Sequence, residues 1–412
     1  MKTENRYPSK FSPAVSIILL FGVISMFGDV IYETARSSNS QYLQMLGISA
    51  AKVGFVFGLG EFLGYFLRIL SGMLSDKHGN HWIFLFLGYG LLLVVPLIGL
   101  TTQWNFIILF ILLERIGKAL RSPAKDTILS EVADQQVGVG FAFGLQEALD
   151  QIGAFAGPLI FTAIFYFTGK NGIAEYQLGY QLLIIPYIAL MFLLYLVFRR
   201  VKSRQILPAH REQGAEEKTN PIFWVYMAFT FFCTMGFVNF STVGYHLKTT
   251  GLMSDGNIVL IYSMAMAVDA VTALVVGRAY DKRKKSSGEK SGGLLILVVL
   301  PIFSLLQPFF SLSHSVPLLC IGLLLFGIIM GMHETVMRSA IADVTPFHKR
   351  GIAYGIFNAA YGLALFIGAS LMGFFYDLQQ LPILYLFTIL CEIAALIFYA
   401  KLRTLVKRSA KE

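Results

Sequence analysis

Ionisable side chains lie inside long apolar stretches of this chain. In residues 14–43, Asp29, Glu33 and Arg36 are spaced four and three apart, so a helix places all three on one face. In residues 104–132, Glu114 and Arg115 lie near the middle of a second apolar stretch. A carboxylate surrounded by apolar groups and close to an arginine can bind and release a proton when its surroundings change. The alternative is that these neighbours form ion pairs that only hold the helices together.

Further ionisable residues occur in the same setting. A central Asp or Arg costs about 2.5–3.5 kcal/mol to insert into a bilayer, so retained ones usually face a cavity or a partner. For His333, a simple hydrogen bond within the bundle is the alternative to a functional role. For Glu392 we expect partial exposure or a neighbouring donor. The residues that we expect to bind a solute or couple protons are Asp29, Glu33, Arg36, Glu61, Glu114, Arg115, Glu147, Asp150, His333 and Glu334.

The composition indicates a membrane protein. The chain has 412 residues, of which 56% are hydrophobic and 14% charged, and its mean hydropathy is +0.66. A soluble domain of this size is not so apolar. The net charge of +9 comes from basic residues in the short breaks between apolar stretches, which is typical of membrane topology and not of nucleic-acid binding. The three cysteines lie apart, and no nucleotide, metal or hydrolase motif occurs, so we expect no enzyme, cofactor or metal.

Twelve stretches are long enough to cross a bilayer as helices. Lysine and arginine gather in every second connection, which places both termini in the cytoplasm and the chain in the cytoplasmic membrane as a multi-pass protein. The expected spans are residues 14–43, 49–74, 82–101, 104–132, 141–167, 180–198, 222–248, 255–280, 293–312, 316–344, 352–376 and 381–402.

The chain divides into two similar halves. A polar linker at 199–221 separates an N-terminal bundle, 1–198, from a C-terminal bundle, 222–412. Residues 140–144 and 351–355 share a Gly-x-Ala-aromatic-Gly pattern. Both halves begin on the inner side, so we expect an all-α polytopic fold of two six-helix bundles related by a pseudo-two-fold axis along the membrane normal.

A short turn between the second and third spans resembles the loop signature of the major facilitator superfamily. Gly72, Asp76, Lys77 and Gly79 match it, and a weaker copy with Asp281 follows in the second half. Gly153, Gly157 and Pro158 are similar to the core of the antiporter motif of the prokaryotic proton-coupled antiporters in that superfamily. The resemblance implies that spans 1, 4, 7 and 10 line a central cavity and that spans 3, 6, 9 and 12 face outward.

The resemblance also implies a cytoplasmic gate. Asp76 would cap the start of the span at 352–376 and meet Arg121 or Lys125, and Arg338 would form a further ion pair at the gate. A plain solvated turn is the alternative for the loop.

The function that we expect is secondary active transport by alternation of the two bundles. The leading hypothesis is a proton-coupled antiporter that exports a small charged or amphipathic organic solute. The alternatives are a proton symporter that imports an anionic metabolite or chelate, and a membrane receptor that does not transport. The expected partners are a small solute, protons and the lipid bilayer, with no nucleic acid, and the expected state is a monomer.

Overall fold

The computed structural model describes residues 13–78, 80–134, 139–202, 221–287, 292–345 and 350–409, and every element within these ranges is a helix. The first half contains α1 (Pro13–Met45), α2 (Ala50–His78), α3 (His81–Gly90), η1 (Leu91–Leu93), α4 (Val94–Ile98), α5 (Trp104–Asp134), α6 (Val139–Ala156), α7 (Leu159–Thr168), α8 (Ile173–Leu182) and α9 (Ile184–Lys202). The second half contains α10 (Pro221–Gly236), α11 (Phe240–Thr250), α12 (Asp255–Ser287), η2 (Gly292–Val298), α13 (Val299–Ser311), α14 (Val316–Met332), a π-helical turn η3 (His333–Met337), α15 (Arg338–Val344), α16 (Arg350–Asp377) and α17 (Leu381–Ser409).

Each of the twelve expected spans corresponds to a helix or to helices in series. Eleven of them are long and apolar enough to cross a membrane within the described residues. The span that falls short is α5, which is 31 residues long but carries Glu114, Arg115, Lys118, Arg121 and Lys125. α5 is long enough to cross a membrane, but its charged residues make it less apolar than the other spans. Two of these residues, Arg115 and Lys118, belong to the site described below.

Three spans differ from expectation. The span expected at 180–198 begins earlier, at Ile173, because the Glu175 side chain accepts a hydrogen bond of 2.9 Å from the backbone N–H of Gly172 and caps α8. The span expected at 222–248 is interrupted at 237–239. The span expected at 316–344 contains the π-helical turn η3.

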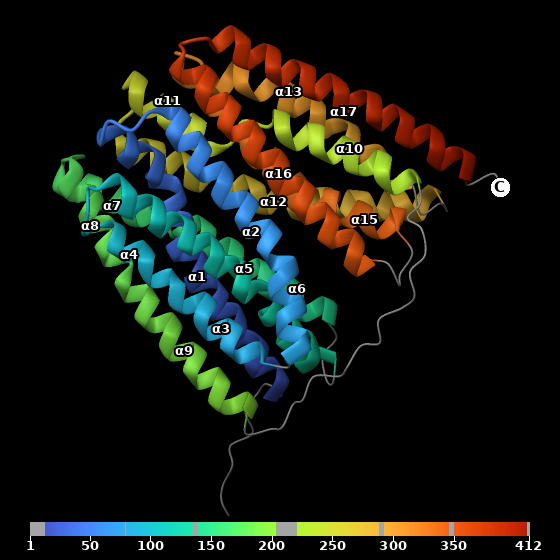
Figure 1. Ribbon diagram of the computed structural model, residues 1–412, viewed down its shortest axis with the longest axis horizontal. Coiled ribbons are helices and arrows are strands. Elements are labelled where there is room, and N and C mark those ends of the chain that lie inside the picture. Colours follow the sequence, from blue (N-terminus) through green and yellow to red (C-terminus); the bar gives the residue numbers. More distant parts are fainter. Residues whose placement is uncertain are drawn as a thin grey trace, which may run out of the picture.

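The two halves pack along α2 and α16 (Figure 1). A Cβ atom added at Gly58 would lie 2.9 Å from the carbonyl oxygen of Phe366, and one added at Gly54 would overlap the carbonyl oxygen of Ala369. Glycine therefore allows the two backbones to touch.

The halves meet firmly at one end and spread apart towards the other, where α9 ends and α10 begins (Figure 1). At the joined end, the Asp377 carboxylate accepts hydrogen bonds from the backbone N–H groups of Ala50 and Ala51, at 2.7 and 2.9 Å. There the hydroxyl of Tyr176 also donates to Asp255, at 2.8 Å.

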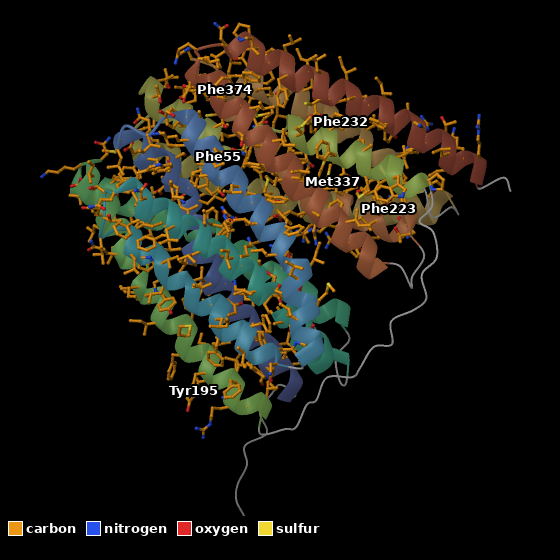
Figure 2. All side chains as sticks on the ribbon, in the orientation of Figure 1. Phe55, Tyr195, Phe223, Phe232, Met337 and Phe374 are labelled. Carbon is orange, nitrogen blue, oxygen red and sulfur yellow. The ribbon has the colours of Figure 1, made fainter. Side chains whose placement is uncertain are left out.

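The outer surface of the bundle is apolar. Ile185, Ile188 and Phe192 on α9 are each more than 60% exposed, and Ile397 on α17 is equally exposed. Tyr195 points away from the bundle on the same helix as the first three (Figure 2). Such a continuous apolar face is stable against lipid tails and not against water.

Glu392 on α17 is fully buried, so the first expectation, partial exposure, is wrong, and the second, a neighbouring donor, corresponds to the thiol of Cys233 on α10. The residue faces the interior of the second half, because a methyl group placed on Gly236 of α10 would lie 2.5 Å from its Oε1 atom.

Candidate functional site

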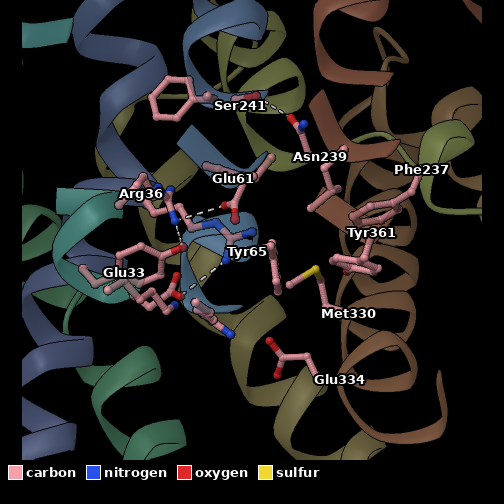
Figure 3. A pocket seen from close by; sticks show the side chains of 17 residues that line it. Glu33, Arg36, Glu61, Tyr65, Phe237, Asn239, Ser241, Met330, Glu334 and Tyr361 are labelled. Carbon is pink, nitrogen blue, oxygen red and sulfur yellow. Dashed lines mark hydrogen bonds and ion pairs between the residues drawn. The ribbon is translucent and has the colours of Figure 1, made fainter. Parts of the chain in front are cut away.

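A cavity of about 80 Å³ lies between the two halves (Figure 3). Its walls come from α1, α2 and α5 of the first half, and from the 237–241 segment, α14, η3 and α16 of the second. The cavity walls thus include the expected spans 1, 4, 7 and 10, together with spans 2 and 11. Ionisable side chains and tyrosines dominate the first-half wall, which consists of Tyr32, Glu33, Arg36, Phe57, Glu61, Tyr65, Arg68, Arg115 and Lys118.

Arg115 is the centre of the charge network on the first-half wall. Its guanidinium lies 3.1 Å from Glu61 of α2 and 3.3 Å from Glu114 of its own helix. It also donates a hydrogen bond to the hydroxyl of Tyr32 on α1. One buried arginine therefore connects three helices. A buried charge with several charged and hydrogen-bonding partners is held in one position, because every alternative position leaves a charge uncompensated.

Glu33 connects the two halves across the cavity. Its Oε1 atom lies 3.4 Å from Arg36, one turn further along α1. Its Oε2 atom accepts a hydrogen bond from the hydroxyl of Tyr262, which belongs to α12 of the other half. A change in the charge of Glu33 would act directly on a contact between the halves.

Two cations on the first-half wall lie against aromatic rings, and the charge of Asp29 also reaches one of them, Lys118. The ammonium group of Lys118 lies 3.8 Å from the centre of the Tyr32 ring, and the guanidinium of Arg68 lies 4.8 Å from that of Tyr65. Within the described ranges, neither cation forms an ion pair. An aromatic face attracts a cation but leaves its charge uncancelled, so both remain available to an anionic group.

The second-half wall has the opposite polarity. Glu334, in the π-helical turn η3, is the one charged side chain among the residues that this half contributes. It lies on the opposite side of the cavity from Glu33 and Arg36 (Figure 3). The first-half wall carries four cations and two carboxylates, a surplus of two positive charges, and faces a single carboxylate. Among the lining residues, positive charge therefore predominates on the first-half wall and negative charge on the second-half wall.

His333 precedes Glu334 but does not line the cavity. It is 2% exposed, its Nδ1 atom lies 3.0 Å from the hydroxyl of Tyr361, and its ring lies 5.3 Å from that of Phe237. Tyr361 and Phe237 are both cavity residues, so His333 supports the wall from behind.

The helix break at 237–239 forms part of the same wall. The Asn239 side chain accepts a hydrogen bond of 3.4 Å from the backbone N–H of Thr242, which caps α11. Behind the break, the Gln307 side chain donates to the carbonyl of Val238 at 2.8 Å and accepts from its N–H at 3.3 Å. One buried glutamine therefore satisfies both backbone groups that the break leaves without helical partners.

Comparison with known proteins agrees with this arrangement. The sequence model of the Major Facilitator Superfamily matches residues 14–310 and 260–412. The chain belongs to the major facilitator superfamily. An uncharacterized protein of Mycobacterium tuberculosis is 34% identical over 405 residues, covering 95% of this chain and 94% of the relative. An uncharacterized MFS-type transporter of Methanocaldococcus jannaschii is 25% identical, covering 88% of this chain and 89% of the relative.

A solved structure shares the fold. A bacterial homologue of the human lysosomal transporter Spinster, in an inward-facing and unoccupied conformation, superposes with a TM-score of 0.73 at 14% identity, covering 97% of this chain and 99% of that one. The chain is therefore a multi-pass membrane transporter for a small solute, and not an enzyme, with the two-bundle architecture that the superfamily resemblance implied.

Several predicted site residues of this transporter lie away from the cavity. Asp150 on α6 lies 3.9 Å from Lys125 of α5, which donates to the hydroxyl of Ser25 on α1 at 2.9 Å. Glu147 is exposed and accepts a hydrogen bond of 3.2 Å from Gln151. Lys125 and Asp150 thus form a second polar cluster inside the first half.

Asp29 and Glu114 flank the cavity without lining it. Asp29 lies between this second cluster and Lys118, within range of the charges of Asp150 and Lys125. Glu114 is 6% exposed and pairs with Arg115.

The structure describes only some of the predicted gating residues. The side chains of Asp76, Lys77 and Asp281, and all of Gly79, lie outside the described residues. Arg121 lies over the ring of Tyr89 in the first half, at 5.2 Å. Arg338 is exposed, and its backbone carbonyl accepts a hydrogen bond of 3.2 Å from Tyr354. A Cβ atom at Gly72 would make only ordinary contact, 3.5 Å, with Pro123 of α5.

The motif at Gly153, Gly157 and Pro158 packs one helix of the first half against another. A Cβ atom at Gly157 would lie 2.6 Å from the carbonyl oxygen of Val30, and one at Gly153 would overlap the carbonyl of Met26. Both glycines therefore bring α6 against α1. The helix is interrupted at Gly157 and Pro158, between α6 and α7, because proline supplies no N–H to continue it.

Proposed function

We propose that this transporter moves a small zwitterionic organic solute, with protons as the coupling ion. The observation that supports the proposal is the opposed polarity of the two cavity walls. Lys118 and Arg68 would receive an anionic group such as a carboxylate, and Glu334 would receive an ammonium group. A solute with both charges would bridge the halves, and its binding would then favour the state in which both walls are close.

The ion pairs of Arg115 and Arg36 would hold the helices around this site in place and would not bind the solute directly. Both arginines already have acidic partners, at 3.1 Å and 3.4 Å. A solute carboxylate would have to displace these partners, whereas Lys118 and Arg68 have no carboxylate within ion-pair distance among the described residues.

Glu33 is our choice for the proton-carrying group among the predicted carboxylates. It is 7% exposed and touches both its own half, through Arg36, and the other half, through Tyr262. Protonation would weaken the ion pair with Arg36 and leave Tyr262 with a neutral acceptor. Loading a proton would thereby loosen a contact between the halves, which is the coupling that alternating access needs.

The joined and open ends of the structure fit one state of such a cycle. With the cytoplasmic termini that the loop charges predict, the joined end at Asp377 is the outer one, and the cavity belongs to an inward-facing state. The predicted contact of Asp76 with the start of α16 would form in the opposite, outward-facing state.

The substrate class is tested by thermal stability of the purified transporter, because ligand binding raises apparent stability by mass action. Small amino acids and dipeptides should raise the melting temperature, while their N-acetylated and C-amidated forms, which each lack one charge, should not. Glu334→Gln should abolish the preference for a free amine and Lys118→Met the preference for a free carboxylate. Lys170→Met, at an exposed outer position, is the matched control. Equal responses to the charged and blocked compounds would contradict the zwitterion hypothesis.

The direction of coupling is tested in proteoliposomes with an imposed pH gradient. Solute movement against the proton flow supports the antiport that we favour, and movement with it supports the symport alternative. Tyr262→Phe should reduce the dependence of transport on the gradient, because it removes the hydroxyl that joins Glu33 to the other half. Transport that ignores the gradient in the unmodified protein would refute proton coupling.

A further inference from the structure

A second buried carboxylate lies away from the central cavity, in the interior of the second half. Glu392 on α17 has no solvent exposure, and neither of its oxygens accepts a hydrogen bond from an N–H or O–H group of the described residues. The polar group beside it is the thiol of Cys233 on α10, which is a weak donor. Within the described ranges, no lysine, arginine or histidine lies close enough to offset its charge.

Glu392 lies against the end of a broken helix. α10 ends at Gly236, and a methyl group on this glycine would lie 2.5 Å from Oε1 of Glu392. The last carbonyl groups of a helix lack helical partners and carry partial negative charge. A carboxylate anion beside this helix end would be destabilised by that partial negative charge, because the surrounding protein screens it only weakly.

The broken helix joins Glu392 to the central cavity. The three residues that follow Gly236 form the break, and two of them, Phe237 and Asn239, line the cavity. Gln307 of α13 holds the third, Val238, by its backbone. Glu392 therefore lies behind the same segment of chain whose front face forms the cavity wall.

We propose that Glu392 is a proton-binding site of the second half, and that its protonation sets the shape of the helix break at 237–239. A proton cancels the charge without needing space. Loss of the proton would leave an anion beside the C-terminal end of α10, where the partial negative charge of the helix end disfavours it, and would loosen the packing of α17 against the break. The site is independent of Glu33 and of any particular solute, and it would let the second half respond to pH by itself.

The first test measures the break itself. Ser241 lines the cavity just beyond the break, so Ser241→Cys, in a background with the exposed Cys320 replaced by serine, reports its shape through the rate of thiol labelling. Because the thiolate is the reactive form, the reference is Glu392→Gln, whose labelling rate should rise with pH only through ionisation of the introduced thiol. We expect the unsubstituted background to depart from this reference several-fold as the pH rises. The matched control is Thr388→Val, one turn away on α17 and equally buried, which should keep the full pH response.

Equal pH responses in Glu392→Gln and the unsubstituted background would overturn the proposal, whatever substrate the transporter proves to have. A Na⁺-specific effect at high pH that disappears in Glu392→Gln would also overturn it, because the occupant would then be a metal ion.

A second test needs no variant. An apolar carbodiimide reacts with protonated carboxyl groups, so mass spectrometry of the intact transporter after labelling at neutral pH should find the adduct on the peptide that contains Glu392. The labelling should fall as the pH rises. An unlabelled Glu392 at neutral pH, with other buried carboxylates labelled, would refute the proton assignment even if Glu392→Gln failed to fold.

Discussion

Asp377 offers a direct test of how the two halves are held together at their joined end. It ends α16 in the second half, and its two carboxylate oxygens accept hydrogen bonds from Ala50 and Ala51, the first residues of α2 in the first half, at 2.7 and 2.9 Å. One carboxylate thus caps a helix of the other half. The cap exists only while the halves are joined at this end, so the whole of its free energy favours that state.

The magnitude follows from the two parts of the cap. Loss of a capping side chain costs about 1 kcal/mol, and loss of a negative charge at a helix N-terminus costs about 0.3–1 kcal/mol more. Asp377→Ala should therefore shift the equilibrium towards the state open at this end by about 1.5 kcal/mol, roughly tenfold. Asp377→Asn keeps an oxygen acceptor and loses only the charge, so its shift should be about two- to fivefold.

Spin labels at the joined end would measure this shift. Thr102→Cys and Val316→Cys lie in or next to connections of the two halves at that end and are exposed, and serine at Cys320 removes the competing exposed thiol. Electron–electron resonance should show the longer-distance population rising in the order wild type, Asp377→Asn, Asp377→Ala. Lys170→Ala, exposed at the same end, should leave the distribution unchanged. Identical distributions in all four proteins would show that the cap does not stabilise the joined state.

Two further substitutions test the packing. Gly54→Ala would place its methyl group on the carbonyl of Ala369 and force α2 away from α16, so it should lower the melting temperature. Gly90→Ala is the control, because no atom lies within 4 Å of the added methyl group, and it should not lower the melting temperature. Equal melting temperatures for the two variants would contradict the close approach of α2 to α16. Gln307→Leu would leave the N–H and the carbonyl of Val238 without partners, which should lower the free energy of unfolding by about 1–3 kcal/mol for each group and so lower the melting temperature. A melting temperature equal to that of the wild type would show that water replaces the amide.

The helical architecture and the location of charge could be predicted from the sequence because both depend on local composition. Apolar stretches of fixed length predict the spans. Charges inside them mark α1, α2 and α5, which line the cavity, but also α6 and α17, which do not. The close pairs Glu33–Arg36 and Glu114–Arg115 follow from spacing along one chain segment. The contact between Arg115 and Glu61 could not be predicted in this way, because it depends on how α2 lies against α5.

The broken helices could be predicted only in part. Asn239 followed by Ser241 and Thr242 is a helix-start signal that indicates the break before α11. The signal is weak in so apolar a stretch, and the glutamine that stabilises the break lies about seventy residues away. No local pattern marks the π-helical turn that contains Glu334. The hydroxyl that reaches Glu33 from Tyr262 is likewise a consequence of assembly.

The two halves contribute different features to the cavity: the first half contributes charged side chains on continuous helices, and the second half contributes irregular backbone. On the first-half wall the charges stand on the long helices α1, α2 and α5, and Arg115 and Tyr32 connect all three. Groups held in this way keep their positions when a solute binds. The second-half wall is built from the break at 237–239 and the π-helical turn, where the backbone does not follow the α-helical pattern.

Irregular backbone at membrane depth is stable only beside protein or a cavity, and it changes shape at lower cost than a continuous helix. We therefore expect the second half to move its wall towards a bound solute while the first half fixes the solute's orientation. The proposed role of Glu392 fits this division, because a buried group whose charge can change has an effect only where the backbone beside it can move.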